Sequence, residues 1–79
     1  MDIQKLIVFC VTKLVDKPEV VTVTQKDSHG GKSMYEIRVA SQDLARVIGK
    51  EGRTFKALRA LVTLVAPEQV HDIVVDTAT

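Results

Sequence analysis

Two glycines separated by two residues, Gly49 and Gly52, interrupt a stretch of the sequence that otherwise has the pattern of a helix. Glycine in a helix interior costs about 1 kcal/mol relative to alanine, so the pair indicates a tight turn between two helices. The second helix is expected to begin near Arg53 and to run to about Ala66, where Pro67 ends it. Its apolar residues gather on one side of a helical wheel and its basic residues on the other.

A short helix is predicted before this turn. Ser41 is a favourable N-cap residue, and the helix dipole favours Asp43 in the first turn. Leu44, Val47 and Ile48 supply the apolar face of this short helix. The glycine turn is therefore expected to join a short helix to a longer one.

A further helix is predicted near the start of the chain, over residues 2–15, because apolar residues recur there at spacings of three and four. Pro18 follows this helix and ends it. Val8 and Phe9 lie beside the apolar stripe, and they are either an exposed docking patch or, as we expect, part of a wider buried face. The residues of the stripe are Ile3, Leu6, Ile7, Cys10, Val11, Leu14 and Val15.

Three segments are predicted to be strands. Residues 19–26 are rich in Val and Thr, residues 34–39 alternate apolar with polar side chains, and residues 70–75 are mainly apolar. The polar segment 27–33 should connect the first two strands as an antiparallel hairpin. The third strand follows the two helices, so it should lie parallel to the second strand after a right-handed crossover.

The predicted order of elements is therefore α-β-β-α-α-β. A three-stranded mixed sheet with three helices on one face makes a two-layer α+β domain. The 79 residues leave room for one domain, which we expect to span residues 1–79. The composition, with 46% apolar and 27% charged residues, is ordinary for a folded domain and unlike that of a disordered chain.

Several classes of function are not expected from this sequence. No apolar run approaches the roughly 20 residues of a membrane span, and the single Cys10 cannot form an internal disulfide, so a cytoplasmic location without membrane contact is expected. His29 and His71 lie far apart in the sequence, which argues against a metal site. We expect no cofactor and no enzymatic activity, because no nucleophile, base and acid form a recognisable arrangement.

The positive charge of the chain is concentrated in one stretch. Residues 44–60 contain five basic residues against the single acid Glu51, a net charge of +4, whereas the whole chain has only +1 and the remainder therefore −3. Such a concentration is typical of a phosphate-binding surface, although a solvated basic helix face would have the same charge. The five basic residues are Arg46, Lys50, Arg53, Lys56 and Arg59.

The glycine turn also has the chemistry of an anion site. It brings backbone N–H groups to the start of the helix at Arg53, where the donors lack helical partners and the helix dipole is positive. Lys50 and Arg53 add side-chain charge, and the glycines remove β-carbons that would keep a ligand backbone away. A glycine C-cap with no ligand is the simpler alternative for an isolated pair of this spacing.

The segment Val47–Arg53 resembles the I-G-x-x-G signature of KH domains, and α-β-β-α-α-β is the order of the type II KH fold. The longer segment Asp43–Arg59, together with Leu14–Pro18, is similar to the small bacterial KH proteins of the KhpA family. This resemblance implies a single-stranded RNA ligand of about four nucleotides, clamped by the loop in a groove between the two helices and the sheet. The residues expected to bind RNA are Ile48, Gly49, Lys50, Glu51, Gly52, Arg53, Lys56, Arg46 and Arg59.

The resemblance also implies a partner and a cellular role. Proteins of this family pair with themselves or with a larger, Jag-type KH protein, and they act as RNA chaperones or post-transcriptional regulators linked to cell shape. The alternative is a protein-interaction module, in which a degenerate KH fold forms dimers and no longer binds RNA. The intact pair Gly49 and Gly52, with Lys50 and Arg53, favours RNA binding over this alternative.

Overall fold

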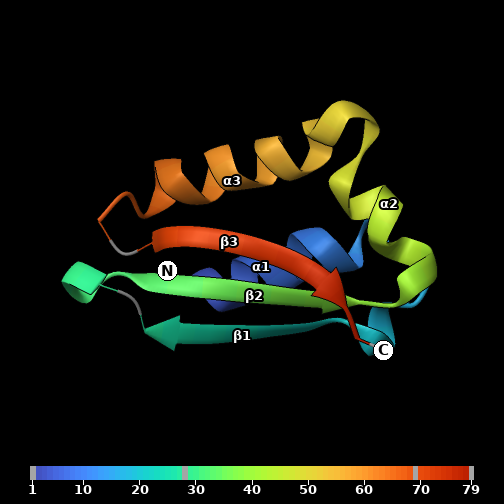
Figure 1. Cartoon of the computed structure of the whole chain (residues 1–79), viewed down its shortest axis with the longest axis horizontal. Coiled ribbons are helices and arrows are strands. Elements are labelled where there is room, and N and C mark those ends of the chain that lie inside the picture. The colour runs from blue at the N-terminus through green and yellow to red at the C-terminus, as the bar shows by residue number, and fades with distance from the viewer. Residues whose placement is uncertain (1, 28, 69, 79) are drawn as a thin grey trace.

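The computed structural model describes residues 2–27, 29–68 and 70–78, and it has the predicted order of elements (Figure 1). Short 3₁₀ turns precede β1, β2, α2 and α3. The helices and strands are α1 (Ile3–Thr12), β1 (Thr22–Asp27), β2 (Ser33–Val39), α2 (Leu44–Ile48), α3 (Arg53–Val65) and β3 (Val70–Thr77).

The sheet is mixed, with β2 between β1 and β3. β1 pairs antiparallel with β2, so that Val23 lies opposite Ile37, and β2 pairs parallel with β3, so that Ile37 lies opposite Val75. The helices α2 and α3 form the crossover between β2 and β3. The expected sheet topology is therefore confirmed, and the glycine turn lies within the crossover.

The core lies between the sheet and the helices, all of which cover one face of the sheet; α1 lies behind it in the view of Figure 1. Alternate residues of β2 point into the core, as the period of a strand requires. The opposite face bears polar residues such as Glu36, which pairs with Lys26 at 3.4 Å and with Arg38 at 3.3 Å. The buried residues are Ile3, Ile7, Val11, Val23, Tyr35, Ile37, Val39, Val47, Leu58, Val62, Ala66 and Ile73.

The predicted boundaries of the first helix and the first strand were wrong, and the third strand extends to Thr77, two residues beyond its predicted end. The first helix ends at Thr12 instead of residue 15, and the hydroxyl of Thr12 donates to the carbonyl of Val8 at 2.8 Å within its last turn. The first strand begins at Thr22 instead of residue 19, because Pro18–Val20 form a 3₁₀ turn. Proline suits the first position of such a turn, where its missing N–H has no helical partner to lose.

The predicted capping of the short helix was also wrong. Ser41 does not cap it; residues Ser41–Asp43 form a 3₁₀ turn that leads directly into α2. Asp43 is fully buried, and its carboxylate accepts hydrogen bonds from the backbone amides of Asp16 at 3.0 Å and Lys17 at 3.1 Å. This carboxylate joins the segment after α1 to the start of α2.

The apolar faces of the helices are less completely buried than their patterns predicted. Val8 packs partly against the core, but Phe9 is 62% exposed, so the expectation of a wider buried face was wrong for Phe9. On α3, Leu61 and Val65 are about 40% exposed and Leu64 is 80% exposed. Apolar surface therefore remains open on the outer side of the helical layer.

Within the described residues, no helix is long and apolar enough to cross a membrane. The same part of the chain contains no group of three or more potential metal ligands among His, Cys, Asp and Glu. The side chains of His29 and His71 lie outside the described structure, so the absence of a metal site at these two histidines stays a prediction.

Candidate nucleic-acid interface

The turn between α2 and α3 depends on backbone conformations that suit glycine. Gly49 has φ 77° and ψ 172°, a region that is essentially restricted to glycine. Gly52 has φ 74° and ψ 14°, in the left-handed helical region, and Glu51 between them also has a positive φ of 57°. The amide of Gly52 donates to the carbonyl of Gly49 at 3.1 Å and closes the turn. The two glycines therefore set the path of the loop that joins the helices.

The N-terminus of α3 lies at this loop and has no side-chain cap, since Gly52 occupies the cap position. The helix has 13 residues, and its first-turn N–H groups lie at the positive end of the helix dipole. An anion beside the loop would meet backbone donors that no side chain covers. The N–H of Arg53 already donates to the carbonyl of Lys50 within the turn, so the later N–H groups of the first turn are the candidate donors for an anion.

The five basic residues around the loop fall into two groups. Lys50 and Lys56 form no ion pair with any described residue, whereas each of the three arginines pairs with one carboxylate. All three pairs are substantially exposed, and exposed pairs of this kind contribute about 0–1 kcal/mol. The arginine pairs are Arg46–Asp16 at 3.2 Å, Arg53–Glu51 at 3.6 Å and Arg59–Asp72 at 3.2 Å.

α3 presents a basic flank toward the edge of the sheet. Lys56 and Arg59 are three residues apart and so lie on neighbouring turns of one flank. The pair of Arg59 with Asp72 on β3 shows that this flank faces the edge strand. The Lys56 side chain lies beside the loop, since a β-carbon at position 52 would be 3.7 Å from its Cε. Basic side chains therefore extend from the loop along the flank of α3 that faces β3.

Comparison with known proteins gives the family. The model of the family described as "KhpA/KhpB, KH domain" matches residues 4–76. This chain belongs to the KhpA/KhpB KH-domain family. A search of solved structures gave no significant match.

Three KhpA relatives illustrate the similarity, and each carries the name RNA-binding protein KhpA. The protein of Leifsonia xyli is 52% identical over 56 residues, covering 71% of this chain and 72% of the relative. That of Chlamydia trachomatis is 44% identical over 64 residues, covering 80% of each chain. The Listeria monocytogenes protein is 42% identical over 59 residues, covering 75% of this chain and 76% of the relative.

In this KhpA/KhpB-type domain, most of the expected site residues lie close together. The loop Gly49–Gly52 is flanked by Ile48, the last residue of α2, which is 36% exposed, and by Arg53, the first residue of α3, and Lys56 lies on the next turn. Arg59 lies further along the same flank of α3. Arg46 instead lies beside the segment after α1, where it pairs with Asp16. We therefore separate Arg46 from the residues at the loop.

The acidic partners of Arg46 and Arg59 could not be found by sequence analysis. Asp16 and Asp72 lie far along the chain from the arginines that they contact, so no local spacing connects them. Asp43 was expected in the first turn of a helix, where the dipole favours a carboxylate, and the structure places it at the N-terminal cap position of α2 without a side-chain cap hydrogen bond. Only the folded chain shows that its carboxylate holds the segment after α1.

Proposed function

We propose that this protein binds single-stranded RNA through the loop Gly49–Gly52. The main support is that three features occur at one place: a glycine-dependent turn, a helix N-terminus without a side-chain cap, and two cations, Lys50 and Lys56, that pair with no carboxylate among the described residues. Its KhpA relatives carry the name RNA-binding protein, which agrees with this proposal. We expect a segment of about four nucleotides to occupy the site, as in KH domains generally.

The proposed binding mode assigns a separate task to each part of the site. One backbone phosphate accepts hydrogen bonds from the N–H groups at the start of α3, where glycine permits a close approach. Lys50 and Lys56 lie beside neighbouring phosphates, and the exposed Ile48 offers an apolar contact for a base. The strand then follows the flank of α3 that faces β3 as far as Arg59.

The ion pairs of the arginines fit this mode as exchangeable contacts. Arg53 is held by Glu51 and Arg59 by Asp72, and both pairs are open to solvent. A phosphate competes with a carboxylate for a guanidinium, and guanidinium groups bind phosphate in a bidentate geometry. RNA binding is therefore expected to exchange carboxylate partners for phosphates. The carboxylate of Glu51, which lies in the loop itself, should weaken binding until it is displaced.

The proposal includes pairing with a second KH-containing chain, either a copy of itself or a larger Jag-type protein. One domain that grips about four nucleotides has few contacts, and linking two weak sites raises apparent affinity by about 10²–10⁴. The exposed Leu64 and Val65 at the end of α3 supply apolar surface for such pairing. In this form the protein, as one domain in the cytoplasm, would act as an RNA chaperone or post-transcriptional regulator linked to cell shape.

A double substitution in the loop tests RNA binding directly. Lys50→Asp together with Glu51→Asp places two carboxylates at the phosphates, and both side chains are exposed, so the fold should be retained. We expect at least a tenfold or so loss of affinity for a short single-stranded RNA, measured by fluorescence anisotropy. Lys32→Asp, in the exposed hairpin loop, changes net charge equally and serves as the control. Unchanged affinity in a folded double variant would refute the proposed site.

A second candidate function, protein pairing without RNA binding, is favoured by the exposed Leu64 alone. Sedimentation velocity at micromolar concentration, with and without an RNA long enough for two sites, distinguishes the two. A dimer that forms without RNA and does not bind the added RNA would favour the second candidate. A strict monomer in both conditions, with no KH-containing partner in a pull-down, would remove pairing from the proposal.

A further inference from the structure

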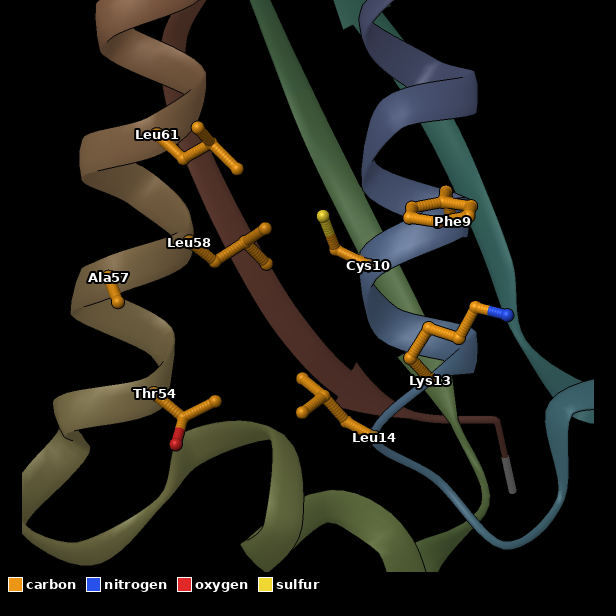
Figure 2. Close-up of a pocket in the computed structure, with 8 residues that line it drawn as sticks. All are labelled: Phe9, Cys10, Lys13, Leu14, Thr54, Ala57, Leu58 and Leu61. Carbon is orange, nitrogen blue, oxygen red and sulfur yellow. The ribbon is translucent and has the colours of Figure 1, made fainter.

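The two flanks of α3 face different surroundings. Leu58 and Leu61 point from α3 toward α1 and line an apolar groove between the two helices (Figure 2). Lys56 and Arg59 lie on the opposite, basic flank, and the guanidinium of Arg59 lies 3.2 Å from the carboxylate of Asp72 on β3. The surroundings of Asp72 therefore decide what an RNA strand that follows the basic flank would meet on the sheet.

The carboxylate of Asp72 lies at the open edge of the sheet. β3 is an edge strand, so one side of its backbone has no partner strand. The amide of Ala78 donates to the carbonyl of Val39 on β2 at 2.8 Å, so the backbone of residue 78 points toward β2. Successive peptide groups of a strand point in opposite directions, which turns the amide of Ile73 toward the open edge. Oδ1 of Asp72 accepts from this amide at 2.8 Å.

The two oxygens of this carboxylate have unequal surroundings. Oδ1 accepts from the amide of Ile73 and also pairs with the guanidinium of Arg59. Oδ2 forms no hydrogen bond or ion pair with a described residue, and the Asp72 side chain is 39% exposed. An ionised carboxylate only accepts hydrogen bonds, so a group that binds Oδ2 must be a donor. The backbone thus fixes the carboxylate while one of its oxygens stays open.

We propose that Asp72 determines base specificity by accepting a hydrogen bond from the exocyclic amino group of one RNA base, and so disfavours uracil at that position. This inference deepens the proposed RNA binding and rests on it. A carboxylate is a suitable acceptor for the amino group of cytosine, and adenine and guanine also carry an amino group. Uracil instead presents a carbonyl oxygen on each side of its N–H, and these oxygens repel a carboxylate.

The exchange of partners at Arg59 brings a base to Asp72. A phosphate that binds the guanidinium leaves the hydrogen bond from Ile73 in place, so the carboxylate stays at the edge after its cation has left. Arg59 lies about 10 Å along α3 from Gly52. The base that contacts Asp72 therefore belongs to a nucleotide near one end of the four-nucleotide segment, away from the nucleotide that lies on the loop.

Asp76 is a matched carboxylate on the same strand. Its Oδ1 accepts from the amide of Thr77 at 2.7 Å, as Oδ1 of Asp72 does from Ile73. Asp76 forms no ion pair with a described residue, and it lies about 13 Å further along β3. It therefore shares the edge position of Asp72 but not the neighbouring guanidinium, which makes it a suitable control.

NMR titrations of the intact protein with tetranucleotides test the proposal. The reference ligand contains only uridine, and in the other ligands cytidine replaces one uridine at a time, which puts an amino group in place of a carbonyl. We expect one position at which cytidine binds about fivefold more tightly than uridine. At that position adenosine should also bind about fivefold more tightly than purine riboside, which lacks only the amino group.

Asp72→Asn should remove this preference. Asparagine keeps an oxygen for the amide of Ile73 but brings a donor to the base, so cytidine and uridine should bind within about twofold of each other. The freed Arg59 raises the affinity for every ligand, so the ratio between two ligands is compared. Asp76→Asn changes the charge equally and should keep the preference of about fivefold. Urea unfolding checks that both variants are folded.

Two results would overturn the inference and leave the RNA site intact. The first is equal binding of all the tetranucleotides, when the double substitution of Lys50 and Glu51 still weakens it. The second is a preference for cytidine that Asp72→Asn preserves, or that Asp76→Asn abolishes in its place. Failure of the RNA site itself gives a different result, because the ligands then do not bind or bind the loop variant equally well, and the inference fails with it.

Discussion

Gly49 lies against Thr54, the second residue of α3, so closely that no side chain fits between them. A β-carbon on residue 49 would lie 2.7 Å from Cβ and 2.9 Å from the backbone nitrogen of Thr54, distances that β-carbons in proteins essentially never show. Gly52 differs, because a β-carbon there would meet only Cε of Lys56 at 3.7 Å. The two glycines of the loop therefore have different physical reasons for being glycine.

This difference predicts unequal costs for one substitution. Gly52→Asn should cost about 1 kcal/mol of the free energy of unfolding, because asparagine tolerates the left-handed region. Gly49→Asn should cost about 3 kcal/mol or more, because its conformation is restricted to glycine and the new β-carbon collides with Thr54. Urea unfolding followed by circular dichroism measures both. Equal costs would contradict the packing of residue 49 against α3.

The buried carboxylate of Asp43 predicts a large loss on truncation. Asp43→Ala leaves the amides of Asp16 and Lys17 without their acceptor, which should cost about 3 kcal/mol. Asp16→Ala is the control, because it removes only the exposed pair with Arg46 and should cost less than about 1 kcal/mol. If the two variants unfold at similar urea concentrations, the buried carboxylate does not hold this segment as described.

Removing the partner of an arginine should strengthen RNA binding. Asp72→Asn keeps an acceptor for the amide of Ile73 but frees Arg59, which should raise affinity by about twofold to fivefold. Asp27→Asn is the control, because it removes the same single negative charge at the exposed end of β1, far along the chain from the loop. Anisotropy titrations at one ionic strength compare the two variants. An equal gain in both would assign the effect to overall charge rather than to the released guanidinium.

The slope of log K for RNA binding against log salt reports how many phosphates the protein neutralises. If Lys50, Arg53 and Lys56 contact about three phosphates, log K should fall with log salt at a slope of about −2. Lys50→Ala should reduce the slope by about 0.7, whereas Lys32→Ala should not change it. Titrations between low and moderate salt provide the slopes. A flat response in the wild type would mean that the basic flank is only a solvated surface.

Glu36 predicts part of the acid sensitivity of the fold. A hydrogen bond from Arg38, supported by the charges of Arg38 and Lys26, lowers the pKa of Glu36 below its ordinary value of 4.5, although desolvation opposes this. The ionised carboxylate therefore stabilises the fold above pH 4.5, and this contribution is lost as the pH falls through the lowered pKa. Glu36→Gln should flatten that part of the acid-unfolding curve. Glu19 is exposed and pairs with no cation among the described residues, so Glu19→Gln should leave the curve unchanged.

The fold could be predicted from the sequence because its main signals are local. The spacing of Ile3, Ile7 and Val11 specifies a helix with one buried side, and alternation through Tyr35 and Ile37 specifies a half-buried strand. Once the order of elements is known, the right-handed crossover rule leaves few topologies. The sequence signal for the loop is also local, since two glycines at a fixed spacing can be recognised without any knowledge of the fold.

The features that escaped prediction depend on contacts between distant parts of the chain. Asp43 looked like a helix-terminus residue, and only the return of the segment after α1 turns it into a buried acceptor. Phe9 was expected to widen the buried face of α1, with an exposed docking patch as the alternative, but its side chain is 62% exposed. The acidic partner of Arg59 lies on the last strand, and no sequence spacing could identify it.

The position of the loop within the β2–β3 crossover has a consequence for the order of folding. Ile37 pairs with Val75, about half the chain further on, and closing such a long segment is slow compared with forming a hairpin or a helix. β3 also follows the loop in the chain, so during synthesis the glycine turn leaves the ribosome before the strand that completes its support. A growing chain can form α1 and the β1–β2 hairpin early, but the proposed RNA surface is complete only when β3 pairs with β2.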